Sequence, residues 1–310
     1  PWATAFLLTH FHADHYGGLT RSWAAARIYT SAVTARLVRL RIGVDAAYLR
    51  PVPLGVPIPL DEEPGVTLTA VDANHCPGAV MFLLSNATTG RVVLHSGDTR
   101  AAERVVWGPG SPLAGVRVHD LYLDTTYCDA RYTFPSQEAV LRAVVAAVRE
   151  ATAAPGARPL LLFPAYTIGK EKVVLAAAAA LGVPVRVEPS KAAVLGCCDL
   201  PDYARVFVTD GPAGRGGGAG GRGGGASGPR SPIRMVRWGT FCRAGGRPDW
   251  AAMRGLLDAE NAVAAAGGWP RFTNAVGFVP TGWTHTGGVP GGGRGGGGGS
   301  GDGGGGGGGG

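Results

Sequence analysis

The sequence is poor in the residues that stabilise small secreted folds or build cysteine-based metal sites. Its 310 residues include only 5 cysteines, and no two of them form a C-x-x-C pair. An odd number of cysteines without that spacing argues against a disulfide framework and a thiolate zinc knuckle, and fits a reducing compartment. No apolar run approaches the roughly 20 residues that a membrane-spanning helix requires, and the N-terminus lacks a charged-then-apolar signal pattern. Composition therefore gives no indication of a secreted or a membrane-embedded protein.

Glycine, by contrast, is abundant but unevenly distributed. Residues 211–229 contain 11 glycines and residues 287–310 contain 19, so these two stretches hold 30 of the 53. Such segments cannot bury an apolar core, because they have almost no side chains to pack. We therefore expect a flexible glycine-rich insertion at 211–229 and a disordered glycine-rich tail at 287–310. The foldable chain is limited to about residues 1–210 and 231–286.

The net charge of +7 does not by itself identify a nucleic-acid partner. Residues 1–210 carry 19 basic and 18 acidic side chains, whereas residues 211–310 carry 10 and 4. Most of the excess positive charge therefore falls in the last third of the chain, which contains the glycine runs. A basic isoelectric point is compatible with phosphate binding, but this distribution does not locate a basic groove.

Apolar periodicity predicts a mixed α/β protein in which strands dominate the first third. Ser31 precedes a helical pattern that ends at Arg41, and residues 86–90 are typical of a hairpin turn. From residue 119 onward strands and helices alternate, which indicates an α/β arrangement. The expected strands are 5–9, 66–71, 79–84, 91–95, 120–123, 160–163, 205–208, 233–238 and 275–279, and the further helices are 135–152, 169–181 and 249–266.

The most informative segment is the H-x-H-x-D-H pattern that follows the apolar run 5–8. It holds three of the chain's 7 histidines and one carboxylate within six residues, namely His10, His12, Asp14 and His15. Neutral imidazoles and carboxylates suit zinc, and they converge only if the backbone turns sharply at the end of a strand. Residues 16–18, Tyr-Gly-Gly, can supply that turn.

Two further donors, His75 and Asp98, also stand just after predicted strands. Together with the first cluster they predict one metal site or two adjacent ones, with Asp98 bridging both ions. Metals in such a pair turn a shared water into a hydroxide nucleophile at neutral pH and act as Lewis acids on the oxygen under attack. The pattern therefore favours hydrolysis without a covalent intermediate.

With these residues in place, the chain resembles the metallo-β-lactamase/β-CASP nucleases of DNA cross-link repair. The resemblance extends from the start of the chain to about residue 286 and depends on four further stretches. They are D-A-N-H-C-P-G-A-V-M (72–81), L-D-T-T-Y-C with T-F-P-S-Q (123–128 and 133–137), I-G-K-E-K (168–172) and P-T-G-W-T-H (280–285). The H-x-H-x-D-H pattern alone would also admit thioesterases, lactonases and RNA-processing enzymes.

The resemblance implies a partial metallo-β-lactamase αββα sandwich at 1–123. It also implies an inserted β-CASP α/β region at 124–286, interrupted by the glycine-rich insertion at 211–229. It assigns the first zinc to His10, His12, His75 and Asp98, and it places Asp14 and His15 with Asp98 around a second zinc. Asp124 would support the site by orienting a ligand imidazole; the alternative is a turn cap.

Lys170 and Lys172 are candidates for contact with a DNA phosphate at the start of a helix, although a K-E-K run is equally typical of a solvated face. Tyr127, Tyr132, Tyr166 and Trp283 are weaker candidates for stacking on unpaired bases, since aromatic residues near strands more often belong to the core.

The chain also departs from the family pattern. No histidine follows His285, so the second metal position lacks one protein ligand, and the first strands of the hydrolase fold are missing. We therefore expect a sequence that is incomplete at both ends and that binds one or two zinc ions.

The leading hypothesis is a zinc-dependent DNA nuclease of interstrand cross-link or double-strand-break repair, with Asp14, Asp98 and Asp124 as catalytic carboxylates. By resemblance, it would be a 5′-to-3′ exonuclease that accepts 5′-phosphorylated DNA ends in the nucleus. Two alternatives remain open: an RNA-processing β-CASP endonuclease and an inactive DNA-binding remnant.

Overall fold

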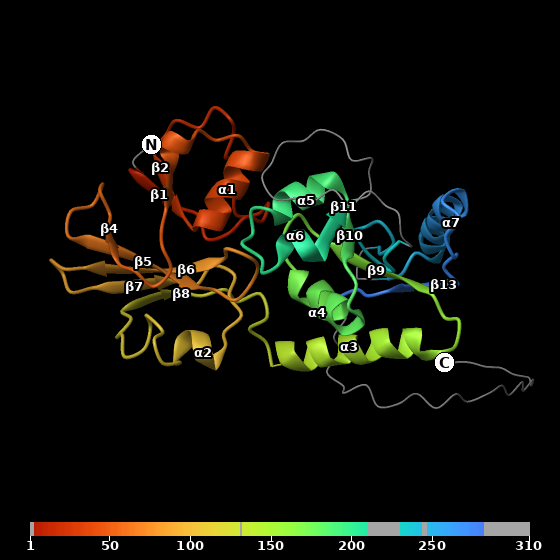
Figure 1. Ribbon diagram of the computed structural model, residues 1–310. Coiled ribbons are helices and arrows are strands. Elements are labelled where there is room, and N and C mark those ends of the chain that lie inside the picture. Colours follow the sequence, from red (N-terminus) through yellow and green to blue (C-terminus); the bar gives the residue numbers. More distant parts are fainter. Residues whose placement is uncertain (1–2, 131, 210–229, 244–246, 282–310) are drawn as a thin grey trace, which may run out of the picture.

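The computed structural model describes residues 3–130, 132–209, 230–243 and 247–281. The predicted glycine-rich insertion and tail, together with Trp283 and His285, lie outside the described residues. Within them, the chain is a mixed α/β protein whose strands form three sheets (Figure 1). None of its described helices is long and apolar enough to cross a membrane.

The first sheet is parallel and has helix α1 on one face. Ser31 caps α1 as predicted, because its hydroxyl accepts a hydrogen bond from the Thr34 N–H at 3.2 Å. Ile28 packs against α1, whereas the next residue, Tyr29, packs against the second sheet. The elements are β1 (Ala5–Leu7), β2 (Arg27–Thr30), α1 (Ala32–Arg41), the 3-10 helix η1 (Ala46–Tyr48) and β3 (Leu49–Pro51).

The second sheet is antiparallel except for its last pair, β7 and β8. Its side chains alternate between two cores: Val80 and Phe82 face the first sheet, while Met81 and Leu83 face α2 (Glu103–Val106). The layers therefore run α1, first sheet, second sheet, α2 (Figure 1). In spatial order the strands are β4 (Ile58–Pro59), β5 (Val66–Asp72), β6 (Val80–Asn86), β7 (Val92–His95) and β8 (Asp120–Tyr122).

The third sheet is entirely parallel. Its strand β9 is buried along its whole length, as expected for a strand covered on both faces. Val148 of α3 and Val174 of α4 pack on one face, and Met253 of α7 packs on the other. In spatial order the strands are β11 (Phe207–Thr209), β10 (Val185–Val187), β12 (Ile233–Arg237), β9 (Pro159–Ala165) and β13 (Asn274–Gly277), and the helices are α3 (Gln137–Ala153), α4 (Glu171–Leu181), α5 (Pro189–Leu195), α6 (Tyr203–Val206) and α7 (Trp250–Ala266).

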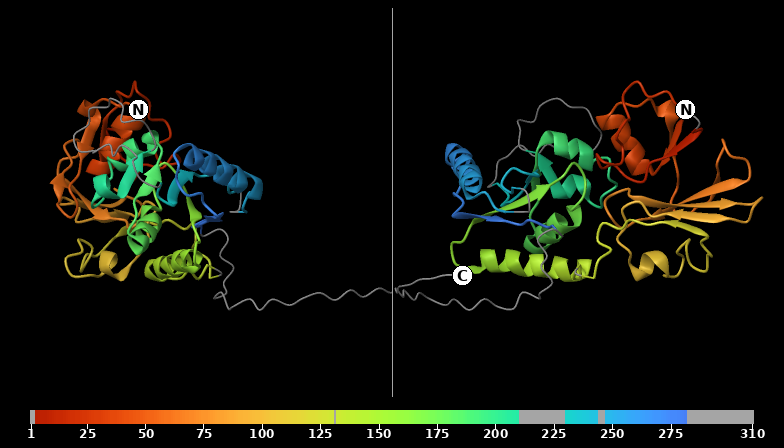
Figure 2. Two further views of the ribbon diagram at one scale, coloured as in Figure 1. Left: turned by 45° about the vertical axis from the view of Figure 1, so that its right-hand side comes forward. Right: turned by 180° about the vertical axis from the view of Figure 1, so that it is seen from behind.

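The third sheet lies beside the first two, and the two parts share a core (Figure 2). Ile168 and Val194 join Leu37 and Val38 of α1 in one apolar cluster. The Arg36 guanidinium of α1 donates two hydrogen bonds to the Cys197 carbonyl, at 2.9 and 3.2 Å. Residues far apart in sequence can therefore meet along this junction. The boundary predicted at 123/124 and the β-CASP limit at 286 remain predictions.

Two predictions of secondary structure were wrong in detail. Residues 205–208 are not one strand, because α6 occupies the chain to Val206 and β11 begins at Phe207. Lys170 is not inside a helix: α4 begins at Glu171, and Lys170 precedes it in a left-handed conformation. The short strands β2, β3 and β10 escaped prediction, since runs of three or four residues give little periodic signal.

Candidate metal centre

Four predicted donors come from loops that follow three different strands. His10 and His12 follow β1, His75 follows β5, and Asp98 follows β7. The loops are tied together by a hydrogen bond from the Val80 N–H to the Thr9 carbonyl at 2.9 Å. Gly97 allows the loop after β7 to lie against Thr9, because a Cβ at position 97 would be only 2.9 Å from the Thr9 side chain. The φ of Gly97, +52°, also favours glycine. Local turns thus bring the donors to one edge of the two sheets.

The donor atoms of these four residues all lie within 4.8 Å of one another. The Nδ1 atom of His12 is 3.0 Å from Nε2 of His10 and 3.2 Å from Nε2 of His75. The Oδ2 atom of Asp98 is 3.7 and 3.6 Å from the same two Nε2 atoms. In a tetrahedral zinc site, ligand bonds near 2.0–2.1 Å place neighbouring donors about 3.3–3.4 Å apart. The four side chains therefore have the spacing needed to hold one metal ion.

The outward-facing ring nitrogens of two of these histidines have hydrogen-bond partners. The Ile168 carbonyl lies 3.1 Å from His12 Nε2 and can only accept, so Nε2 carries the proton and Nδ1 keeps a lone pair toward the centre. Nδ1 of His10 lies 3.1 Å from the Thr9 hydroxyl. These contacts fix the imidazoles in the orientation that a metal ligand needs.

Asp98 also faces a second, smaller group of donors. Its Oδ1 atom lies 3.1 Å from Nε2 of His15, which in turn lies 3.6 Å from Oδ2 of Asp14. The Asp14 side chain is 78% exposed, whereas His10 is fully buried. The carboxylate of Asp98 thus connects a partly buried four-donor group to a more open group that has two donors of its own.

Burial dominates the electrostatics of the centre. It lowers the pKa of His10 to about 2, and the nearby imidazoles of His12, His15 and His75 lower it further in the same direction. Burial also lowers the pKa of His75 to about 4, assisted by His12 and Arg100 and opposed by Asp124. Desolvation raises the pKa of Asp98. The metal-free centre therefore keeps His10 and His75 neutral, in the form that binds a metal.

This arrangement predicts acid-sensitive stability for the metal-free protein. Both histidines titrate near 6.5 when unfolded but at about 2 and about 4 when folded, so the unfolded state gains protons first as the pH falls. The free energy of unfolding should decrease below pH 6.5 by up to about 1.4 kcal/mol per pH unit for each histidine. For His75 this loss ends near pH 4, where the folded imidazole is also protonated.

Urea unfolding in EDTA between pH 7.5 and 4.5 measures this effect. The double substitution His10→Gln/His75→Gln should flatten the pH dependence relative to the unsubstituted chain. His119→Gln, at an exposed histidine, should leave it unchanged. If the free energy of unfolding falls equally with pH in the unsubstituted chain and in the double variant, these two imidazoles do not cause the acid sensitivity.

The loop that supplies the Ile168 carbonyl is held by a buried ion pair. The Glu171 carboxylate accepts the Gly169 N–H at 2.9 and 3.0 Å and pairs with the Lys191 ammonium at 3.1 Å. Lys191 also donates to the carbonyls of Tyr166 and Thr167, at 3.2 and 2.9 Å. Sequence analysis did not identify Glu171 or Lys191, because only the tertiary structure brings α5 to this loop.

The remaining predicted residues lie around the centre. Asp124 is close enough to influence His75 and Asp98 electrostatically, while its Oδ1 accepts the Thr126 N–H at 2.9 Å as a turn cap does. The Lys172 ammonium donates to Asn74 Oδ1 at 2.8 Å and so steadies the loop next to His75. The Lys170 ammonium lies over the Trp238 ring, at 4.0 Å from its centroid.

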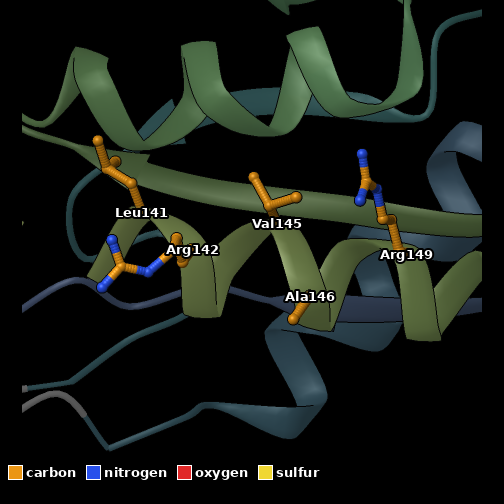
Figure 3. A pocket seen from close by; sticks show the side chains of 5 residues that line it. All are labelled: Leu141, Arg142, Val145, Ala146 and Arg149. Carbon is orange, nitrogen blue, oxygen red and sulfur yellow. The ribbon is translucent and has the colours of Figure 1, made fainter. Parts of the chain in front are cut away.

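The cysteines and the pocket on α3 add no further donor to the centre. The five cysteines are all free, and burial raises the pKa of the Cys76 thiol far above its usual range. A hollow of about 360 Å³ opens on α3 and has no acidic or imidazole side chain in its lining (Figure 3). Its lining residues are Leu141, Arg142, Val145, Ala146 and Arg149.

Comparison with known proteins finds several DNA cross-link repair proteins that are similar to this chain, and also DNA ligase 6 of Arabidopsis thaliana, at 30% identity over 290 residues. It is 41% identical over 210 residues to DNA cross-link repair protein SNM1 of Arabidopsis thaliana, covering 68% of this chain and 42% of that protein. It is 43% identical over 210 residues to the human DNA cross-link repair 1A protein, covering 67% of this chain and 19% of that protein. It is 36% identical over 213 residues to the 5′ exonuclease Apollo of Gallus gallus, covering 69% and 43%. No protein-family model matches the chain. The chain thus spans less than half of the length of these relatives.

Proposed function

Because this chain belongs to the family of DNA cross-link repair proteins that includes SNM1 and Apollo, we propose that it is a zinc-dependent DNA nuclease. The observation that carries the proposal is the convergence of His10, His12, His75 and Asp98 at tetrahedral spacing. Three neutral nitrogens and one carboxylate form a donor set that suits zinc. The proposed reaction is hydrolysis of phosphodiesters in DNA, in the nucleus.

We assign the fold as a metallo-β-lactamase sandwich with an inserted β-CASP region. The order of layers, helix α1, two sheets and helix α2, supports the first part of this assignment. The parallel third sheet, which begins after residue 124, supports the second. We place the bound DNA at the junction between the two parts, because the candidate metal ligands lie there, in the loops that follow β1, β5 and β7.

Each carboxylate and imidazole has a defined task in this proposal. His10, His12, His75 and Asp98 would hold a first ion, and Asp14 and His15, together with Asp98, would be the donors for a second. A bound zinc ion supplies Lewis acidity at a phosphoryl oxygen and makes water a better nucleophile. Asp124 would support the site from beside the ligands, where its charge raises the pKa of His75 while its Oδ1 caps the Thr126 turn. The buried Glu171–Lys191 pair holds Ile168 against His12.

A nuclease assay tests the proposal directly. A DNA strand labelled at its 3′ end and phosphorylated at its 5′ end should shorten progressively from the 5′ end in the presence of zinc. The same strand with a 5′-hydroxyl should react more slowly, and EDTA or His12→Ala should stop the reaction. Internal cuts alone would indicate an endonuclease, and cleavage of RNA but not DNA would favour an RNA-processing enzyme. Absence of any cleavage by the zinc-loaded protein would overturn the proposal.

We expect one tightly bound zinc ion per chain. The group around His10 offers four donors, whereas Asp14 and His15 offer only two besides the shared Asp98, and Asp14 is largely exposed. Fewer ligands and open solvent both lower the affinity of the second position. Elemental analysis after dialysis against zinc-free buffer measures the ratio. Two retained ions would contradict this prediction.

A further inference from the structure

Two aromatic rings and an ammonium group form a cluster beside the metal centre. The rings of Tyr166 and Trp238 are stacked, with centroids 4.7 Å apart and planes inclined by 23°. The Lys170 Nζ atom lies 4.0 Å from the Trp238 centroid and 4.7 Å from the Tyr166 centroid. These three separations describe a nearly equilateral triangle. The ammonium therefore contacts both rings of the stacked pair.

Adjacent parallel strands position the two rings. Tyr166 follows the end of β9 and Trp238 follows the end of β12, which pairs with β9 in register. The Trp238 N–H donates to the Ala165 carbonyl at 2.8 Å and extends this pairing by one residue. The rings thus rest on the rigid edge of the third sheet, which fixes their spacing.

Lys170 is held in an unusual backbone conformation. Its φ of +69° is in the left-handed region, which disfavours residues with a Cβ. Such conformations persist only where the surrounding structure imposes them, and they cluster at ligand-binding sites. Here the buried contacts of Gly169 and Glu171 fix the backbone on both sides.

The cluster is open to a ligand on the side of Tyr166, whereas Trp238 is partly buried against the core. Tyr166 is 45% exposed, and within the described residues the Lys170 ammonium makes no hydrogen bond or ion pair. The chain's other two lysines, Lys172 and Lys191, both donate hydrogen bonds to side chains. Lys170 is therefore the lysine whose N–H groups remain available for a ligand oxygen.

The distance to the metal centre is short. The Ile168 carbonyl contacts His12 directly, and a Cβ at Gly169 would lie 3.6 Å from His12 Nε2. Tyr166 and Lys170 are each two residues from Ile168, so their Cα atoms lie within about 7.6 Å of its Cα. Stacked bases follow one another at about 3.4 Å along a strand. The cluster is thus within a few nucleotides of a phosphate at the metal centre.

We propose that Tyr166, Trp238 and Lys170 form a subsite for one unpaired nucleotide next to the scissile phosphate. This proposal rests on the proposed nuclease function. The base stacks on the aromatic pair, and the ammonium binds the phosphate of the same nucleotide. Every base has a face that can stack, so this contact is tolerant of sequence. A paired base inside a duplex is already stacked on its neighbours. The subsite therefore selects single-stranded or frayed DNA over blunt duplex.

Binding in EDTA tests the subsite without cleavage. Fluorescence anisotropy of a labelled single-stranded oligothymidine should show about tenfold weaker binding for Trp238→Ala and a similar loss for Lys170→Gln. Trp238→Phe should restore most of the affinity, because it retains a ring. Trp107→Ala and Trp250→Ala are matched controls, since these tryptophans are 73% and 69% exposed and lie elsewhere on the surface. Both controls should bind like the unsubstituted chain.

An abasic scan shows whether the lost contact is stacking. Removing the base at the position that occupies the subsite should weaken binding by the unsubstituted chain but have little additional effect on Trp238→Ala. The subsite proposal would be wrong if the abasic position and Trp238→Ala weakened binding additively. It would also be wrong if the variants bound single strands as tightly as the unsubstituted chain. Zinc-dependent cleavage by the unsubstituted chain in the same preparation would then leave the nuclease proposal standing. If cleavage fails while the stacking signature remains, the subsite stands and the nuclease proposal fails.

Discussion

Asp98→Asn should abolish metal-dependent cleavage and remove bound zinc. Asp98 is the donor shared by both groups, because Oδ2 faces His10 and His75 while Oδ1 faces His15. Loss of residues that merely orient a ligand typically lowers metal affinity by about 10- to 100-fold, so loss of this shared carboxylate should exceed about 100-fold. Zinc titration against a fluorescent chelator measures the affinity, and the exonuclease assay measures the activity.

The same variant separates the site from the fold. Burial raises the pKa of Asp98, so its charged form is disfavoured in the metal-free protein, and an uncharged amide of the same shape should not destabilise it. Urea unfolding in EDTA should therefore give a midpoint equal to or above that of the unsubstituted chain. Asp258→Asn, at an exposed position of α7, should change neither zinc affinity nor cleavage. Full activity of Asp98→Asn would refute the assignment of the metal centre.

Glu260→Ala should produce the largest loss of stability. Glu260 is buried on α7 and its carboxylate lies 2.8 Å from Arg186, 2.6 Å from Arg234 and 3.3 Å from Arg230. Removing it leaves the buried Arg186 guanidinium without this counter-charge. A broken buried ion pair typically costs about 3–5 kcal/mol, far more than the 0–1 kcal/mol of an exposed pair.

Urea unfolding measures this loss, with Asp258→Ala on the same helix as the matched control. Asp258 is exposed, so its removal should shift the free energy of unfolding by less than about 0.5 kcal/mol. The double substitution Glu260→Met/Arg186→Met should recover part of the stability, because apolar residues of similar volume can replace a buried ion pair, while Arg230 and Arg234 lose Glu260 as a counter-charge but retain some exposure. If Glu260→Ala matches its control, the cluster does not stabilise the packing of α7 on the third sheet.

The candidate metal ligands could be identified from the sequence because of their local chemistry. Three imidazoles in a six-residue span after an apolar run are readable without a fold, and His75 and Asp98 stand at strand ends that periodicity predicts. The helix cap Ser31 was equally readable, since capping depends on neighbouring residues alone. The strands β2, β3 and β10 were not, because their short buried runs carry no periodic signal.

What the sequence by itself determined is the set of donors and the family resemblance, both of which depend on spacing along the chain. Only the tertiary structure decided which distant residues contact the donors and which side chains lie next to them. The Ile168 carbonyl meets His12 across 156 positions of sequence, and Trp238 stacks on Tyr166 because β12 pairs with β9. Contacts of this kind depend on how sheets pack and which strands pair, which no local pattern encodes.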